Sequence, residues 1–401
     1  MHKNRIIQQS FAVPFHYPIH FTRGVFDPSN PLFSEVLSAA SEGTQPKVLF
    51  VIDEGVHNAH PDLGQKIQQY TKQYSSQIHQ TGALIMVPGG ESCKNDSDQV
   101  EVVLRAIEAF GVDRHSFVVA IGGGAVLDMT GFAAAIAHRG VRLIRIPTTV
   151  LSQNDSGVGV KNSVNYFGKK NFLGTFDPPF AVINDSEFLS TLPLREWRSG
   201  IAEAIKVALI KDKDFFDQIE EDADRLNERS IPAMEEQIFR CAMLHAAHIR
   251  SGDPFEKGSA RPLDFGHWAA HKLEQMTAYA LRHGEAVAIG IALDSAYSYL
   301  KGMLTEPEFN RIILLIARLG FDLYIPELTP QPSEHTQHTS VIDGLQEFQE
   351  HLGGELTITL LKQIGEGVEV HEMDIPILLR AINLLREQSD SIQETRNLKS
   401  S

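Results

Sequence analysis

The alternation of short apolar runs with helical stretches constrains the fold of this chain more than any other feature. Five runs typical of β-strands occupy the first half: Lys47–Asp53, Ala83–Pro88, Phe117–Ile121, Val141–Pro147 and Phe180–Asn184. Stretches typical of helices separate several of them: Asp62–His79, Ser97–Ala109 and Ala125–His138. Such alternation is typical of a doubly wound parallel sheet with helices on both faces. The sequence therefore predicts an N-terminal, Rossmann-like α/β domain.

The pattern changes after about Thr191, where strand-like runs give way to long amphipathic stretches. These are Glu196–Ile210, Asp214–Leu226, Met234–Ser251, His267–Ala280, Gly284–Lys301 and Glu306–Leu319. Pro326–Thr339 contains three prolines among mostly polar residues and is typical of a surface loop, whereas Leu356–Leu361 is a possible late strand. We therefore expect an α/β domain over residues 1–192 and an all-α domain over residues 193–401.

The composition argues against several classes of partner. The 401 residues carry a formal net charge of −15, which disfavours nucleic acids and anionic membranes as partners. No apolar run reaches the roughly 18 residues that a transmembrane helix needs. Two cysteines, Cys93 and Cys241, cannot form a disulfide framework, so a reducing, cytoplasmic location is expected.

Polar or glycine-rich features follow four successive predicted strands. They are Asp53, the segment Pro88–Glu91 with Lys94, the triplet Gly122, Gly123 and Gly124, and the pair Thr148 and Thr149. Ligands of such sheets bind at the carboxyl ends of the strands, where glycines let backbone N–H groups approach a phosphate. Each feature alone is more often a turn or a helix cap. Together, the four features predict a nucleotide site.

Three histidines lie close together in the second half of the chain, at positions 267, 271 and 283. His267 and His271 are four residues apart, so a helix would place both on one face. Neutral imidazole is a common ligand of Zn²⁺. The pair lacks the glutamate of an HExxH motif, and this chain has 17 histidines. A metal site and ordinary surface or core histidines therefore both remain open at this stage.

Motifs in both halves of the chain resemble those of the sugar phosphate cyclases, the family that includes 3-dehydroquinate synthase. In order, they are GGGAVLDMTGFAAAIAHRG, IPTTVLSQNDSGVGVKNSVN, GKKNFLGTF, GIAEAIK, LDFGHWAAH and HGEAVAIG. The resemblance implies an NAD-binding domain, a helical domain with a catalytic Zn²⁺ or Co²⁺, and a homodimer. It also implies a carbon–oxygen lyase that converts a phosphorylated ketose to a carbocycle, with phosphate elimination, by oxidation, elimination, reduction and intramolecular aldol addition.

The resemblance also implies roles for individual residues. Matching metal ligands are Glu203, His267 and His283. Matching catalytic residues are Lys161, Lys206, His271, Asp155 and Asp264. Matching NAD contacts are Asp53, Glu91, Lys94, Gly122, Gly123, Gly124, Asp128, Thr148 and Thr149. Matching substrate contacts are Lys170, Asn171 and the phosphate-binding Arg139, with His351 as a candidate replacement for a phosphate-binding lysine pair. The lysines and Arg139 would give this acidic chain a basic pocket for phosphate, although each lysine alone is as typical of solvated surface.

Three positions depart from the motifs of 3-dehydroquinate synthase. An asparagine is replaced by Asp264, an arginine by Ala260 (with Arg261 one place later), and a lysine by Ala246. In that enzyme the two cations help to hold a carboxylate, so their loss and the added anion disfavour a carboxylated substrate.

The motifs NDSGVGVK and LDFGH instead resemble 2-epi-5-epi-valiolone synthases, which implies sedoheptulose 7-phosphate as the substrate. The stretch SQNDSGVGVKNSVN also resembles cyclase-like proteins of ebo-type gene clusters, so a third substrate is open. Three further alternatives are 3-dehydroquinate synthase proper, an NAD- and metal-dependent polyol or glycerol phosphate dehydrogenase, and a non-catalytic metabolite-binding protein. The lysines of DSGVGVK and GKKN argue against the dehydrogenase.

Overall fold

The computed structural model describes residues 6–40, 45–167, 169–255, 263–330, 340–351 and 354–400. Its first half has the predicted α/β arrangement. In chain order the elements are β1 (Ile19–Thr22), α1 (Leu32–Ser38), β2 (Lys47–Asp53), α2 (Glu54–Ala59), α3 (Leu63–Gln73), β3 (His79–Gln80), β4 (Ile85–Val87), α4 (Ser92–Asn95), α5 (Ser97–Ala109), β5 (Phe117–Gly122), α6 (Gly124–Ile136), η1 (Ala137–Arg139), β6 (Arg142–Pro147), η2 (Ser152–Ser156), β7 (Lys161–Tyr166), β8 (Lys169–Phe176), β9 (Ala181–Asp185) and η3 (Ser186–Thr191).

The second half is mainly helical. Its elements are α7 (Leu194–Lys211), α8 (Lys213–Asn227), α9 (Ile231–Arg250), α10 (His267–Met276), α11 (His283–Leu300), α12 (Glu306–Arg318), η4 (Pro326–Leu328), α13 (Asp343–His351), β10 (Ile358–Gln363), β11 (Glu366–Val370) and α14 (Ile375–Ser400). The predicted combination of a Rossmann-like and a helical part is confirmed. The second part is not purely α, because β10 and β11 pair as an antiparallel hairpin.

Seven strands of the first half form one parallel sheet in the order β1-β9-β6-β5-β2-β3, with β4 also paired to β2, whereas β7 and β8 form a separate antiparallel pair. Asp53 of β2 lies opposite Val87 of β4, and Gly122 of β5 lies opposite Pro147 of β6. This register brings the ends of the four predicted strands to one edge of the sheet. The polar features that follow those strands are therefore neighbours in space.

Both faces of the sheet are buried, which explains why the strands are apolar without alternation. Val48, Phe50 and Ile52 of β2 belong to the core beneath α1 and α3. The intervening Leu49 and Val51 belong to a second core beneath α5 and α6. Burial on both sides of β2 thus accounts for the run KVLFVID.

Two predicted helices are shorter than expected. α3 ends at Gln73, because His79 and Gln80 extend the sheet by pairing with β2. α10 ends at Met276, because Ala278 and Tyr279 adopt positive φ angles of 48° and 62°. These angles lie in the left-handed region, which cannot continue a right-handed helix. Both endings result from local conformations that apolar periodicity does not reveal.

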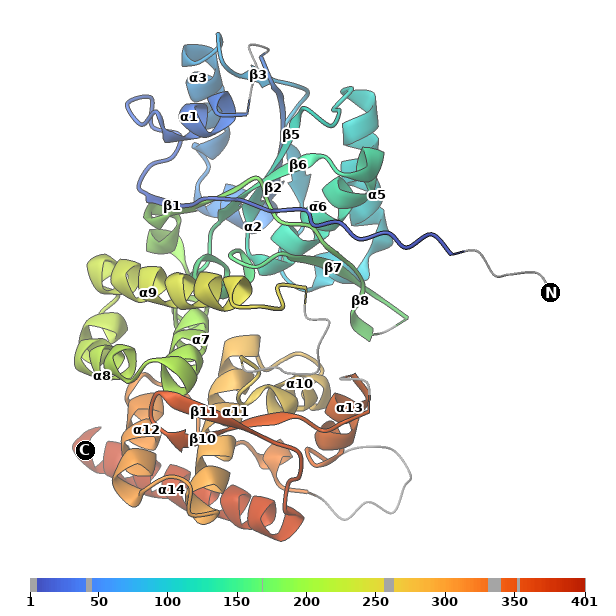
Figure 1. Cartoon of the computed structure of the whole chain (residues 1–401). Helices are drawn as coiled ribbons and strands as arrows, with labels where there is room; N and C mark the ends of the chain where they lie inside the picture. Colours follow the sequence, from blue (N-terminus) through green and yellow to red (C-terminus); the bar gives the residue numbers. More distant parts are fainter. Residues whose placement is uncertain are drawn as a thin grey trace, which may run out of the picture.

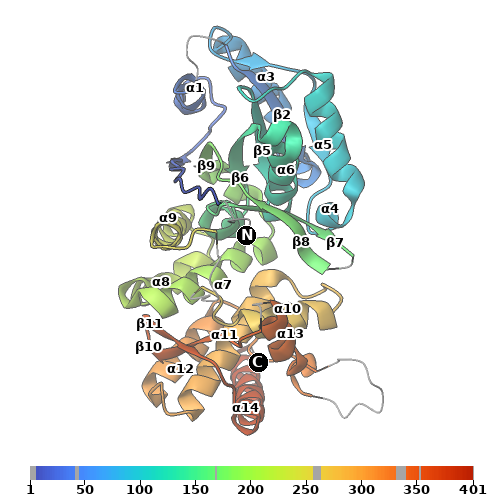
Figure 2. The same cartoon turned by 45° about the vertical axis from the view of Figure 1, so that its right-hand side comes forward.

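In both views of the molecule, helices α7 and α9 lie between the sheet and the helices α10 to α14 (Figures 1 and 2). In the second half, α11 is buried along most of its length and packs against α7, α10, α12 and α14. The site described below is formed where α7, α10 and α11 meet. No helix in the described ranges combines the length and apolar character that crossing a membrane requires.

Candidate active site

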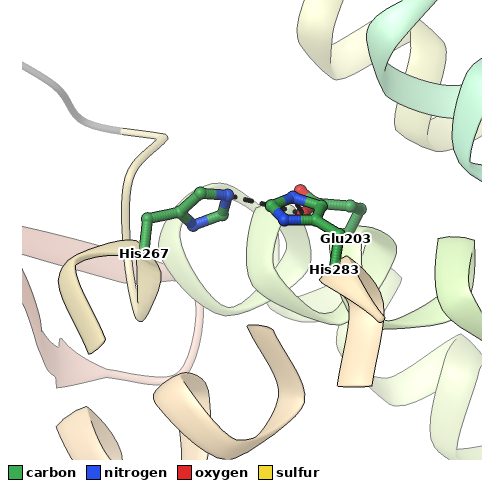
Figure 3. A group of neighbouring side chains, drawn as sticks. All are labelled: Glu203, His267 and His283. Atoms are coloured by element: carbon green, nitrogen blue, oxygen red, sulfur yellow. Dashed lines mark ion pairs between the residues drawn. The ribbon is translucent and has the colours of Figure 1, made fainter. Parts of the chain in front are cut away.

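Three side chains from three helices converge at the junction of α7, α10 and α11. Glu203 lies within α7, whereas His267 and His283 are the first residues of α10 and α11. The Nε2 atoms of His267 and His283 lie 3.5 Å and 3.4 Å from Glu203 Oε1. Figure 3 shows both imidazole rings directed at the carboxylate. One carboxylate and two imidazoles form a typical ligand set for a catalytic Zn²⁺, with coordination positions left for substrate or water.

A glycine and a buried aspartate hold the start of α10 in place. Gly266, immediately before His267, adopts a φ of +76°, in the left-handed region. Asp294 of α11 accepts hydrogen bonds from the Gly266 backbone N–H and from Trp268 Nε1, both at 2.9 Å. These two bonds flank His267 along the chain and tie the first turn of α10 to α11.

Each histidine is oriented through its other ring nitrogen. His267 Nδ1 lies 3.1 Å from the carbonyl oxygen of Phe265, and His283 Nδ1 lies 3.2 Å from Glu274 Oε2. Both contacts direct Nε2 towards Glu203. A hydrogen bond of this kind to the other ring nitrogen fixes the tautomer and ring orientation of a metal-binding histidine. No motif in the sequence indicates Glu274, which is buried on α10.

A second ligand set, made of His271, Glu274 and His283, shares one histidine with the first. His271 lies one turn beyond His267 and is exposed, with its ring 5.5 Å from that of His267. Its His271 is exposed, whereas Glu203 is buried and lies within 3.5 Å of two histidine nitrogens. The geometry therefore favours the Glu203 set for a metal and leaves His271 beside it, as the resemblance implied.

The surroundings of Glu203 keep its carboxylate ionised. Burial would raise the pKa of Glu203, but Lys206 and His267 hold it well below its usual range. Burial would lower the pKa of His283, but the nearby carboxylates of Glu203 and Glu274 raise it to about 9. Neither Glu203 oxygen accepts a hydrogen bond of normal geometry from the described residues, although ion-pair contacts surround the carboxylate. A carboxylate with unfilled acceptor capacity beside two oriented imidazoles matches the donor set of Zn²⁺ or Co²⁺.

The predicted cofactor residues line the carboxyl edge of the sheet. Asp53 accepts a hydrogen bond of 2.7 Å from the Gly55 backbone N–H and so caps α2. A Cβ atom added at Gly89 would crowd the carboxylate of Asp53, so this glycine keeps the space beside it open, whereas one added at Gly122 would first meet Val126. Gly123 and Gly124 begin α6, whose N-terminus favours an anion. Thr148 is buried and Thr149 bonds Ser152, so one predicted contact already has an internal partner.

Lys94 forms the centre of a second polar cluster. Its ammonium lies 2.8 Å from Asp128 and 3.2 Å from Ser163, and it also contacts Asn171. Glu91 accepts a hydrogen bond of 2.9 Å from Asn165 on β7. The β7–β8 hairpin thus brings the predicted substrate contact Asn171 to the predicted NAD contacts Lys94 and Asp128. Neither this hairpin nor Ser163 has a recognisable signal in the sequence.

The remaining predicted residues differ in how near they lie to the metal cluster. Lys206 contacts Glu203, and Asp155 and Asp264 both raise its pKa. Lys170 lies 3.2 Å from Glu274. Lys161 begins β7 as an exposed residue.

Two predicted phosphate contacts are not brought to the cluster by the described structure. Arg139 is exposed in η1, which follows the C-terminal end of α6, whereas the glycine turn lies at the N-terminal end of that helix. The length of α6, about 18 Å, therefore separates Arg139 from the glycine turn. His351 is the last residue of α13, and its side chain lies outside the described part of the chain. Ala260 and Arg261 also lie outside the described residues. Their roles stay predictions.

Arg145 is a further residue that no sequence motif indicated. Its guanidinium is fully buried and donates hydrogen bonds to the carbonyl oxygens of Gly157, Gly159 and Lys161 and to Asn162. It therefore shapes the loop that leads to Lys161. A charged residue inside the apolar run VRLIRIP was the available signal, because buried arginines are rare unless they bind a partner.

Comparisons with known proteins agree with the fold and with the motifs. The family model described as 3-dehydroquinate synthase N-terminal matches residues 84–199, and the C-terminal one matches residues 200–340. The 2-epi-5-epi-valiolone synthase of Streptomyces glaucescens is 32% identical over 377 residues, covering 93% of this chain and 92% of that protein. The chain belongs to the sugar phosphate cyclase family.

Two further sugar phosphate cyclases illustrate the range of the similarity. The 3-dehydroquinate synthase of Pelobacter propionicus is 38% identical over 263 residues, covering 65% of this chain and 73% of that protein. The structure of ValA, the 2-epi-5-epi-valiolone synthase of Streptomyces hygroscopicus subsp. jinggangensis 5008, has a TM-score of 0.83 at 29% identity. The match covers 95% of this chain and 100% of ValA, whose structure has NAD⁺ and Zn²⁺ bound.

Glu274 provides a test of how the orientation of His283 affects metal binding in this sugar phosphate cyclase. Glu274→Gln keeps the side-chain volume but removes the charge that orients His283 and pairs with Lys170. We expect the affinity for Zn²⁺ to fall about 10- to 100-fold, as is typical when the partner that orients a metal-binding histidine is lost. Competition with a chelator of known affinity would measure it. An unchanged affinity would show that His283 is oriented without Glu274.

Asp294 should make stability depend on pH. Burial raises its pKa from 3.8 to about 7, against the lowering effect of the hydrogen bonds from Trp268 and Gly266. The folded state therefore holds this proton more tightly than the unfolded state. Its contribution to stability is complete below about pH 4 and is lost as the pH rises towards 7, on the order of 4 kcal/mol in total.

Urea unfolding of metal-free protein between pH 4 and pH 8 would measure this contribution. Asp294→Asn has no titrating group at this position. The difference in unfolding free energy between the two proteins should therefore change over this range, with the native protein losing relative stability as the pH rises. A difference that stays constant with pH would contradict the prediction, whatever its size.

Proposed function

We propose that this chain is an NAD- and divalent-metal-dependent cyclase that converts sedoheptulose 7-phosphate to a carbocycle with elimination of phosphate. It would thus be a carbon–oxygen lyase acting on a phosphate ester. The observation that carries the proposal is the convergence of Glu203, His267 and His283 beside Lys206, in a chain related to 2-epi-5-epi-valiolone synthases over nearly its whole length.

The residues present fit both cofactors. Glu203, His267 and His283 would hold Zn²⁺ or Co²⁺, and the edge of the sheet from Asp53 to Thr149 would hold NAD⁺. A bound dication supplies Lewis acidity, and NAD⁺ supplies a reversible hydride acceptor, so no net redox change is expected. Lys206 and Lys170 would bind anionic oxygens of the substrate, and the exposed His271 could carry a proton between the site and solvent.

The charges of the pocket support a substrate without a carboxylate. Asp264 is half-buried and close enough to Lys206 to raise the lysine's pKa. A substrate carboxylate there would meet Asp264 as a like charge, whereas a hydroxyl could donate a hydrogen bond to it. Ala246 on α9 supplies no compensating cation. This arrangement favours the polyol chain of a ketose phosphate that has no carboxylate.

Several further properties are part of the proposal. We place the boundary between the two domains at residues 192 and 193, in the short segment between η3 and α7. We also propose a cytoplasmic homodimer, with Lys161 as a catalytic residue and His351 as a phosphate contact. Arg139 lies at the far end of α6 and is not assigned to the phosphate here. Asn171 would bind the substrate beside Lys94.

The first experiment offers the purified protein NAD⁺ with Zn²⁺ or Co²⁺ and one of two substrates. Sedoheptulose 7-phosphate and the carboxylated substrate of 3-dehydroquinate synthase are tested separately. Phosphate release and carbocycle formation are followed together with absorbance of NADH. We expect phosphate and a carbocycle from sedoheptulose 7-phosphate alone, without accumulation of NADH.

Each other outcome points to a different protein. Turnover of the carboxylated substrate would show that a cation elsewhere, such as Arg261, binds the acid, and the chain would then be a 3-dehydroquinate synthase. Net formation of NADH without phosphate release would identify a dehydrogenase. Inactivity with both substrates, despite bound metal and NAD⁺, would contradict the proposed substrate.

A further inference from the structure

A histidine that none of the motifs identified lies against the candidate active site. His245 is on α9, is 7% exposed, and places Nδ1 3.1 Å from Oδ1 of Asp155 in η2. Asp155 is 27% exposed at its side chain, so its carboxylate is accessible while the imidazole of His245 is buried. The pair therefore has a buried member and an accessible member.

The accessible member belongs to the surroundings of the metal ligands. Asp155 raises the pKa of Lys206, whose ammonium pairs with Glu203. Asp155 is thus linked electrostatically, through one lysine, to the metal ligand on α7. The backbone around it is also held, because the adjacent Asn154 donates a hydrogen bond of 2.7 Å to the carbonyl oxygen of Gly200 on α7.

The protonation of His245 follows from its environment. Burial lowers its pKa, against the raising effect of Asp155, so the imidazole is neutral at physiological pH. A neutral imidazole has one N–H, and the carboxylate of Asp155 can only accept a hydrogen bond. The proton therefore sits on Nδ1, and the buried Nε2 has no hydrogen-bond partner among the described residues.

An uncharged donor is well suited to this position. Asp155, Glu203 and Asp264 place three carboxylates around Lys206, and a metal dication would add positive charge nearby. His245 Nδ1 lies 3.1 Å from Asp155 Oδ1, within reach of a hydrogen bond, and a neutral imidazole adds no further charge. The second oxygen, Oδ2, has no donor among the described residues and is free to accept a hydroxyl hydrogen.

We propose that His245 is a positioning residue that holds the Asp155 carboxylate so that it binds a hydroxyl of the substrate beside the metal centre. The proposal rests on the proposed function, because it assigns Asp155 to a polyol. The competing explanation is that the pair only fastens α9 to η2. The two explanations differ in what a retained hydrogen-bond donor would restore.

The test compares His245→Asn with His245→Leu in the full chain loaded with Zn²⁺ and NAD⁺. The asparagine amide can place an uncharged donor near the position of Nδ1, whereas leucine removes the donor at similar volume. We expect leucine to lower kcat/KM for sedoheptulose 7-phosphate by about 10- to 100-fold, the range for a lost hydrogen bond to a charged group. Asparagine should stay within about fivefold of the native protein, a margin that a partly restored bond of this strength allows.

Metal content and NAD⁺ affinity provide the matched controls. Both should be unchanged in both variants, because neither change touches a proposed metal ligand or the edge of the sheet. Equal impairment of the two variants, or full activity of the leucine variant, would overturn the proposal. If the leucine variant does not fold, His245→Gln replaces it, because its longer amide carries the donor past the Nδ1 position and should not restore activity.

A second measurement does not depend on the substrate. In protein labelled with ¹⁵N-histidine, the His245 signal, identified by its loss in His245→Asn, should show a protonated Nδ1 and an unprotonated Nε2. Asp155→Ala should change that tautomer balance. A proton on Nε2 in the native protein would overturn the proposal. An inactive native protein with the expected tautomer would instead contradict the proposed substrate and leave the contact between His245 and Asp155 supported.

Discussion

Replacing Glu203 with glutamine is expected to remove stoichiometric Zn²⁺ and to lower kcat/KM by about 10³-fold or more. Glutamine keeps the volume of the side chain, but its neutral amide is a poor metal ligand, so two histidines would remain. The Lewis acidity of a metal is worth several kcal/mol in such reactions, and about 4 kcal/mol corresponds to 10³ in rate. Metal content after dialysis and phosphate release would measure the two effects.

The fold should survive this substitution, so the loss can be attributed to the site. Lys206 would lose its closest partner, but Asp155 and Asp264 remain near enough to affect its pKa. Glu101→Gln is the matched control, since Glu101 is an exposed glutamate on α5 that pairs with Arg105 and lies far from the metal ligands. Full metal occupancy in Glu203→Gln, or in the double variant Glu203→Ala with His283→Ala, would refute the assigned metal site.

Substituting alanine for Gly266 is expected to destabilise the protein by about 4 kcal/mol or more, a size reserved for a few specific mechanisms. Its φ of +76° already disfavours a side chain. In addition, a Cβ atom would lie 2.6 Å from the Ile291 backbone nitrogen, which cannot rotate away as a side chain could. The start of α10 must therefore move from α11, and His267 would move with it.

Gly302 separates the effect of the left-handed backbone conformation from that of the close approach to α11. Its φ of +78° is nearly the same, but an added Cβ would meet nothing within 4 Å. Gly302→Ala should therefore cost only about 1–2 kcal/mol, the penalty of the left-handed conformation. Urea unfolding would measure both variants, and a Zn²⁺ titration should show weakened binding for Gly266→Ala alone. Equal losses of stability would show that the close approach to α11 is unimportant.

The fold could be predicted in large part because its signals are local. The run KVLFVID and the periodic stretch Ser97–Ala109 were predicted with the bounds that β2 and α5 have. Elements that depend on distant partners were missed. β1 is four residues long and is defined by its pairing with β9, about 160 residues away in sequence. The β7–β8 hairpin has a polar sequence and was not recognised as strands.

The candidate site shows the same division. The spacing of His267 and His271 suggested a pair on one helix face, whereas the structure directs His267 and His283, from the starts of two helices, at Glu203. The resemblance to a family supplied that ligand set; spacing alone did not. Glu274 and His245 had no recognisable motif, because their roles come from contacts with residues on other turns or other helices.

The sequence by itself determined the class of each half of the chain, the glycine turn at the end of β5, and the motifs that identify a sugar phosphate cyclase. Only the tertiary structure decided which side chains meet. In that structure Asp53 caps α2, Arg139 lies at the far end of α6, and His245 contacts Asp155. The physical reason is that periodicity and propensity act over one or two turns of chain, whereas a site is built from contacts between elements that packing brings together.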